Sequence, residues 1–185
     1  MRKSASECGS ARRRRTLTGV FTVILDNIRS TYNVGAIMRT LDGVGGGEIV
    51  CCGITPYPEI PRDTRSPVVR SANTKAIAKT ALGAEQTIKV SHAASAFDAL
   101  VAARDRGEVA VALERHPAAQ DVFEFAAPAD ADIALVLGGE VDGVDDDVLR
   151  ICDAIVEIPQ YGTKESLNVS VAAGVALYAL RAQCN

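Results

Sequence analysis

Tryptophan is absent from this sequence of 185 residues, and aromatic residues make up only 4% of it. A sheet that binds RNA by stacking bases on exposed Phe and Tyr side chains needs more of them, so that mode of recognition is excluded as the main one. Ala, Val, Leu and Ile supply most of the 48% hydrophobic content instead. The sequence therefore predicts an aliphatic core, and its length is enough for one domain to bury it.

Long apolar runs and paired cysteines are also missing. No stretch is apolar and long enough to span a bilayer, and no hydrophobic segment follows the N-terminal arginines as it would in a secretory signal. The five cysteines are odd in number and contain no C-x-x-C pair, which indicates neither a disulfide framework nor a zinc site. We expect a cytoplasmic protein with neither a membrane nor a metal partner.

Charge is unevenly distributed, although the net formal charge is only −3. Residues 1–20 carry six Arg and Lys residues against a single acid, Glu7. A short basic segment among Ser and Gly is typical of a disordered arm, and contact with a polyanion is the functional alternative. We expect residues 1–18 to form such an arm and residues 19–185 to form a single domain.

Apolar runs alternate with helical patterns along the rest of the chain. Runs such as 134–137 lack polar alternation, as strands buried on both faces of a parallel sheet do. The pattern predicts an α/β fold with a mostly parallel six-stranded sheet and helices on both faces. The predicted strands are 21–25, 48–54, 87–90, 109–113, 133–137 and 154–158. The predicted helices are 34–44, 74–82, 96–106, 146–152 and 169–182.

The connection 55–72 is long and contains four prolines. Loops of this length in a compact domain are usually functional or disordered. Its three arginines, Arg62, Arg65 and Arg70, are candidates for contacts with RNA phosphates, and a solvated variable loop is the alternative.

Ligands of open α/β sheets bind outside the carboxyl ends of the strands, and three predicted strands end in unusual residues. After the first strand, Asn33 stands where a helix N-cap belongs, and Gly35 keeps the first helical turn small. Arg39 follows inside this helix. Taken alone, Arg39 would be interpreted as a surface residue paired with Asp42 or Glu48.

The other two strand ends offer bare backbone and small polar side chains. Gly138 and Gly139 leave backbone groups free to bond a small ligand, and 159–168 leads to Ser166 and Asn168, one of which is an N-cap candidate. The acids at 145–147 do not match a calcium loop, and a helix dipole explains acids in a first turn, so no metal site is predicted. The glycines at 43–47 follow a helix and precede a strand, which is the reverse of the dinucleotide-binding order.

Together, the segments 33–40, 137–143 and 158–168 resemble the signature motifs of the SpoU (TrmH-type) RNA ribose 2′-O-methyltransferases of the SPOUT superfamily. The first matches Asn33-x-Gly35-Ala36-x-x-Arg39-Thr40. The second matches Leu137-Gly138-x-Glu140-x-x-Gly143, and the third matches Ile158-Pro159 followed by Ser166-Leu167-Asn168-Val169-Ser170. The similarity extends, in order, over most of the chain.

The resemblance implies S-adenosylmethionine as methyl donor, a deep C-terminal trefoil knot, and a homodimer whose sites use residues of both subunits. The helix expected at 169–180 is the candidate interface. The implied cofactor-binding residues are Leu113, Gly138, Gly139, Ile158 and Leu167. The implied catalytic residues are Arg39, Glu140, Ser166 and Asn168. The RNA-binding candidates are Asn33, Arg39, Arg62, Arg65 and Arg70.

The expected activity is therefore methylation of a ribose 2′-hydroxyl in tRNA or rRNA. Because a guanidinium is not readily deprotonated, we expect Arg39 to hold the phosphate beside the target ribose rather than to act as a base. A non-catalytic RNA-binding or assembly module on the same fold is the main alternative. Such a module would have lost the polar residues of the motifs. Here all four are present: Arg39, Glu140, Ser166 and Asn168. A base methyltransferase and a nucleotide-binding oxidoreductase are weaker alternatives.

Overall fold

A computed structural model describes residues 19–128, 130–139 and 141–183. The predicted basic arm at 1–18 and the predicted catalytic residue Glu140 lie outside the described residues. The strands are β1 (Phe21–Asp26), β2 (Gly47–Cys52), β3 (Lys89–Ala93), β4 (Val109–Leu113), β5 (Gln120–Asp121), β6 (Ile133–Leu137) and β7 (Ala154–Glu157). The helices are α1 (Thr31–Gly43), α2 (Pro67–Ala81), α3 (Ala96–Asp105), α4 (Asp146–Arg150) and α5 (Val169–Gln183), with a 3-10 turn η1 (Ala84–Gln86).

The strands form one parallel sheet in the order β3-β2-β1-β6-β4-β7-β5. The α/β class and the parallel sheet are confirmed, but the prediction of six strands is wrong because the described residues form seven. The strand that was not predicted is β5. It consists of two polar residues on the outer edge of the sheet, where Gln120 pairs with Val156 of β7. A strand this short and polar leaves no hydrophobic pattern in the sequence.

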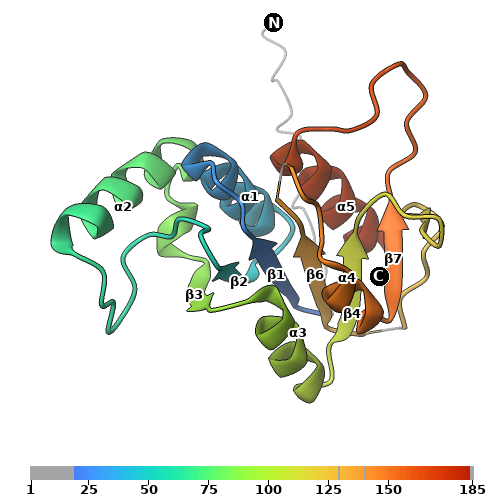
Figure 1. The fold of residues 1–185 in the computed structure, drawn as a ribbon, viewed down its shortest axis with the longest axis horizontal. Coiled ribbons are helices and arrows are strands. Elements are labelled where there is room, and N and C mark those ends of the chain that lie inside the picture. The colour runs from blue at the N-terminus through green and yellow to red at the C-terminus, as the bar shows by residue number, and fades with distance from the viewer. Residues whose placement is uncertain (1–18, 129, 140, 184–185) are drawn as a thin grey trace, which may run out of the picture.

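Helices cover both faces of the sheet, as predicted (Figure 1). Alternate residues of β1 show why: Val23 and Leu25 belong to the core shared with α1 and α5, whereas Ile24 belongs to the core shared with α3 and α4. Both cores are almost wholly aliphatic. The sheet therefore separates two buried layers, which is what continuous apolar strands require.

Two helix starts differ from prediction. Helix α1 begins at Thr31, and its N-cap is Ser30, whose hydroxyl accepts from the Asn33 amide; the prediction that Asn33 is the cap is therefore wrong. Helix α2 begins at Pro67 rather than at 74, capped by the Ser66 hydroxyl. Only Ile77 and Ala81 of α2 are buried, so its first turns leave almost no apolar periodicity to detect.

The strand order determines where a site can form. Strands β6, β4 and β7 are neighbours in the sheet, so their carboxyl ends lie together on one edge. The segment 158–168 leaves β7 at this edge and leads into α5 (Figure 1). The trefoil knot implied by the resemblance stays a prediction. In the described part of the chain, no helix is long and apolar enough to cross a membrane.

Candidate active site

A cleft of about 490 Å³ lies at the carboxyl ends of β4, β6 and β7. Two of the three sequence segments meet there: the turn after β6 and the segment after β7. All five predicted cofactor-binding residues line it, together with two of the predicted catalytic residues: Leu113, Gly138, Gly139, Ile158, Leu167, Ser166 and Asn168.

The turn after β6 forms one wall of the cleft, and its packing requires glycine. Gly143 donates its N–H to the Gly139 carbonyl at 3.1 Å. A Cβ atom on Gly138 would lie only 2.1 Å from the Gly143 carbonyl carbon. Gly143 itself has φ +67, a conformation that favours glycine. At Gly138, Gly139 and Gly143 this wall therefore presents bare backbone, which suits hydrogen bonding to a small polar ligand.

Glu114 holds that turn in place, although no motif in the sequence pointed to it. One of its carboxylate oxygens accepts from the Val144 amide at 2.9 Å, and the other accepts from the Arg115 amide at 2.9 Å. The Cβ position of Gly143 lies 2.5 Å from the first of these oxygens, so a larger residue there would displace the carboxylate. Glu114 comes directly after β4, and applying the strand-end argument to this fourth strand would have found it.

The segment 158–168 forms the opposite wall. Arg115 donates from Nη1 to the carbonyl oxygen of Glu165 at 2.7 Å, and the Glu165 carboxylate lies 3.8 Å away. Gln160 folds back and donates to the carbonyl of Ile158 at 3.0 Å. Arg115 and Gln160 also line the cleft. Both are therefore site residues that the sequence motifs did not indicate.

Asn168 joins the third sequence motif to the first. Its Oδ1 accepts from the Ser170 amide at 2.9 Å and from the Ser170 hydroxyl at 2.6 Å, so Asn168 caps α5. Its Nδ2 donates to Oδ1 of Asn33 at 3.3 Å. These contacts fix the orientation of the Asn168 amide at the mouth of the cleft and bring the start of α1 to it.

Arg39 does not line the cleft. It is exposed and lies in a separate groove of about 610 Å³ between α1, α2 and α5, together with Lys79 and Tyr178. The two acids considered as its partners contact other residues: Asp42 accepts a hydrogen bond from the Thr87 hydroxyl, and Glu48 forms an ion pair with Lys89 at 3.0 Å. The three predicted catalytic residues that the structure describes are therefore divided between two surfaces: Ser166 and Asn168 line the cleft, and Arg39 lies in the separate groove.

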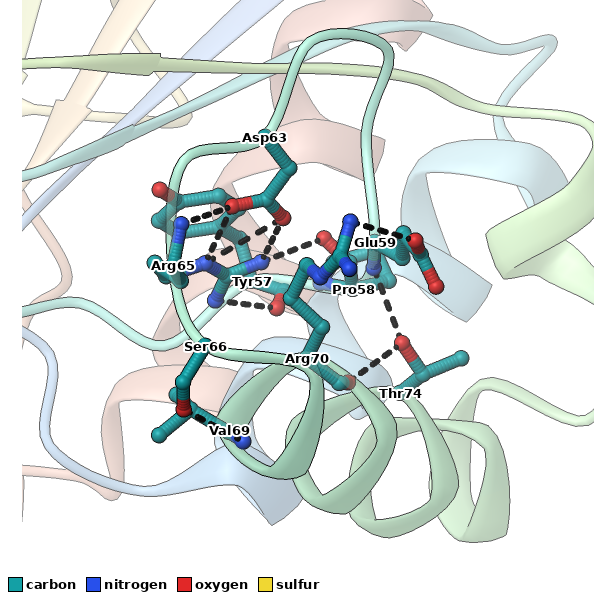
Figure 2. A network of polar contacts seen from close by, with 9 residues as sticks. All are labelled: Tyr57, Pro58, Glu59, Asp63, Arg65, Ser66, Val69, Arg70 and Thr74. Atoms are coloured by element: carbon teal, nitrogen blue, oxygen red, sulfur yellow. Dashed lines mark hydrogen bonds and ion pairs between the residues drawn. The ribbon is translucent and has the colours of Figure 1, made fainter.

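Two of the three arginines predicted to contact RNA from residues 55–72 are engaged within the protein, Arg65 in the connection after β2 and Arg70 in the first turn of α2 (Figure 2). Arg65 lies 3.3 Å above the Tyr57 ring and donates to the Asp63 carboxylate and to the carbonyls of Tyr57 and Pro58. These bonds hold the pKa of Asp63 well below its usual range. Arg70 pairs with Glu59 at 2.9 Å.

Arg65 therefore shapes the connection instead of presenting its guanidinium to solvent, contrary to what we expected of a phosphate-binding residue. Arg62 is the exposed member of the three, and its backbone has φ +60, a conformation that is uncommon for a residue with a side chain.

Two cysteines, Cys51 and Cys52, are buried in the core. Burial raises the pKa of Cys52 to about 12, and it raises the pKa of Cys51 as well. Among the described residues, no group of three or more His, Cys, Asp or Glu side chains could hold a metal ion.

Comparisons with known proteins agree with this geometry. The SpoU rRNA Methylase family matches residues 20–178. The 23S rRNA (guanosine-2′-O-)-methyltransferase RlmB of Ralstonia nicotianae is 33% identical over 158 residues, which cover 84% of this chain and 56% of that protein. An uncharacterized tRNA/rRNA methyltransferase of Mycolicibacterium vanbaalenii is 36% identical over 157 residues, covering 84% and 44%. The chain thus spans about half the length of these curated relatives.

Solved structures show the same fold. The SpoU methyltransferase AviRb of Streptomyces viridochromogenes, in complex with the cofactor AdoMet, matches with a TM-score of 0.69 at 25% identity, covering 90% of this chain and 58% of that one. The TrmH/SpoU tRNA modifying enzyme of A. aeolicus matches with a TM-score of 0.71 at 25% identity, covering 90% and 78%.

Proposed function

Because the chain belongs to the SpoU rRNA methylase family, we propose that it transfers a methyl group from S-adenosylmethionine to a ribose 2′-hydroxyl of tRNA or rRNA. One observation carries the proposal. The turn after β6, where packing leaves no room for a side chain at Gly138 or Gly143, faces Ser166 and Asn168 across a single cleft. A nucleoside can be held there by backbone groups while two small polar side chains remain beside it.

The residues of the cleft fit this donor. The backbone of Leu113, Gly138 and Ile158 would hold its adenosine, with Gly139 and Leu167 completing the enclosure. Bound there, S-adenosylmethionine supplies an activated methyl group on a positively charged sulfur. The contribution of the protein is to place the acceptor hydroxyl in line with that methyl group, because positioning of the two reactants accounts for much of the rate of such a transfer.

Ser166 and Asn168 would orient the ribose hydroxyl. The Asn168 amide is already held on both sides, by Ser170 and by Asn33, so it needs little reorganisation when the substrate arrives. Arg39 would bind the phosphate next to the target ribose and stabilise the negative charge that develops on the hydroxyl oxygen. A guanidinium suits this task because it stays protonated and can bond a phosphate through two N–H groups at once.

The separation of Arg39 from the cleft supports a homodimer in this proposal. Arg39 lies six residues after Asn33, about 9 Å along α1 at 1.5 Å per residue. A second copy could place its own Arg39 over the cleft of the first. The exposed apolar side chains of Val171 and Tyr178 on α5, and of Tyr32 on α1, offer a contact surface for that copy.

Transfer from a labelled donor tests the activity. The purified chain is incubated with total tRNA and rRNA and with S-adenosylmethionine carrying a deuterated methyl group, and the RNA is digested to nucleosides for mass spectrometry. We expect the label on the ribose of one 2′-O-methylnucleoside. Label on a base would replace the proposal with base methylation, and donor binding without transfer to any RNA would favour the non-catalytic module.

Mixed dimers test the shared site. Arg39→Ala and Asn168→Ala chains, each inactive alone, are co-expressed with different tags. If each site combines Arg39 of one copy with Asn168 of the other, random pairing restores about a quarter of wild-type activity, since half of the dimers hold one complete site of two. No recovered activity in purified mixed dimers would mean that both residues act within one chain.

A further inference from the structure

We propose that the consecutive residues Glu114 and Arg115 are the positioning residues of the cleft, and that together they hold its two walls at the separation that binds the donor. The inference rests on the proposed function for the identity of the ligand. It assigns a role to two side chains that are outside the polar set of the sequence motifs.

Their position at the end of β4 explains how neighbours in the sequence reach opposite walls. The ladder continues one residue past β4, because the Glu114 N–H donates to the Val156 carbonyl of β7 at 3.0 Å. Successive side chains of an extended chain point to opposite sides. Glu114 therefore extends toward the turn after β6, and Arg115 extends toward the segment after β7.

Glu114 fixes the first wall through backbone atoms only. It accepts from the Val144 amide and lies against Gly143, and these two residues close the turn on which Gly138 packs. An acceptor with two charged oxygens suits this place, because Val144 and Arg115 each present one N–H to it. A glutamine would keep the shape but turn an N–H₂ group toward one of the two amides.

Arg115 fixes the second wall through its contacts with Glu165 alone, a hydrogen bond to the carbonyl and an ion pair with the carboxylate at 3.8 Å. It donates to the carbonyl of Glu165, the residue just before Ser166, in a segment whose side chains from Tyr161 to Asn168 are all exposed. Burial therefore does little to hold this segment near the cleft. Among the described residues, the hydrogen bond from Arg115 is the main contact that holds it between Gln160 and Asn168.

The variants Glu114→Gln and Arg115→Gln test the pair. The molecule offers matched controls for both. Arg104 makes the same kind of contact as Arg115, to the Ile151 carbonyl and the Asp153 carboxylate, away from the cleft. Glu85 accepts from the Gly83 amide, also away from the cleft. Arg104→Gln and Glu85→Gln therefore remove similar bonds without touching either wall.

Calorimetry with S-adenosylmethionine measures the effect on the donor. We expect each test variant to raise the donor Kd about tenfold, the loss typical of one hydrogen bond to a charged group. The controls should stay within about twofold of wild type, and RNA affinity should be unchanged in all four variants. A merely structural role would lower the unfolding temperature of test and control variants alike and leave the donor Kd unmoved.

Two measurements without donor keep the inference separate from the proposed function. Glu114→Gln should speed hydrogen exchange at the Val144 amide, and Arg115→Gln should speed tryptic cleavage after Lys164. If wild type binds no donor, the proposed function fails, and these two rates alone decide whether the pair holds the walls. Unchanged rates, or an unchanged donor Kd in a wild-type protein that binds donor, would overturn the inference.

Discussion

Replacing Gly138 with alanine should strongly weaken donor binding while the protein stays folded. The added Cβ would lie 2.1 Å from the Gly143 carbonyl carbon, 2.3 Å from its oxygen and 2.4 Å from the Val144 nitrogen. Carbon atoms in contact normally keep about 3.5 Å apart. All three neighbours are backbone atoms, so no side chain can rotate away, and the turn 139–143 has to move as a whole.

The size of the effect follows from that geometry. Overpacking a tight site costs about 1–3 kcal/mol, and the absence of any flexible neighbour places Gly138→Ala at the upper end, about 3 kcal/mol. If the turn moves and the sheet does not, this free-energy cost appears as a loss of donor affinity. The loss is roughly 100-fold at 1.4 kcal/mol per factor of ten. Calorimetry with S-adenosylmethionine measures this loss directly.

Gly162→Ala is the matched control for this substitution. Gly162 lies in the segment that forms the opposite wall, and nothing lies within 4 Å of its Cβ position. The control should bind the donor like wild type. Wild-type donor affinity in Gly138→Ala would refute the idea that the bare backbone of this turn forms the binding wall.

Three further variants test other parts of the molecule. Arg39→Ala should lose methylation with donor affinity intact, because Arg39 lies outside the cleft; equal loss of donor affinity would make it a structural residue. Thr55→Val should lower the free energy of unfolding in urea by about 1–3 kcal/mol, because the buried Thr55 hydroxyl bonds the Ile28 amide and the Leu25 carbonyl; a loss no larger than that of exposed Thr64→Val would contradict this. Asp63→Asn should destabilise the protein at pH 7 but not at low pH. The folded-state pKa of Asp63 lies below its unfolded value of about 3.9, so its contribution is present above that pH and is lost as the pH falls toward the folded value. Equal destabilisation at both pH values would show that the Asp63 charge is not what stabilises the fold.

The central strands could be predicted from the sequence because each is a continuous apolar run. Strands β4 and β6 have the predicted bounds, since burial on both faces leaves no ambiguity about where the apolar residues stop. The edge elements could not be predicted in the same way. β5 is two polar residues long, and the first half of α2 buries nothing, so neither carries a hydrophobic period.

The candidate site was only partly predictable for a different reason. Gly138, Ser166 and Asn168 stand out because they follow strands of the parallel sheet, at the edge where a ligand of an open α/β sheet binds. Glu114 also follows a buried parallel strand, but the sequence does not show that Glu114 and Arg115 each bond a different wall of the cleft. The internal bonds of Arg65 to Tyr57 and Asp63 could not be predicted either, because they depend on the path of the whole connection.

The most direct test of the central claim is a map of 2′-O-methyl positions in total RNA from cells with and without the gene. Cells that lack the gene should lose methylation at one ribose of tRNA or rRNA. The wild-type gene should restore it, and the Arg39→Ala gene should not. Identical maps with and without the gene, from a protein that also fails to bind S-adenosylmethionine, would contradict the proposed methyltransferase activity.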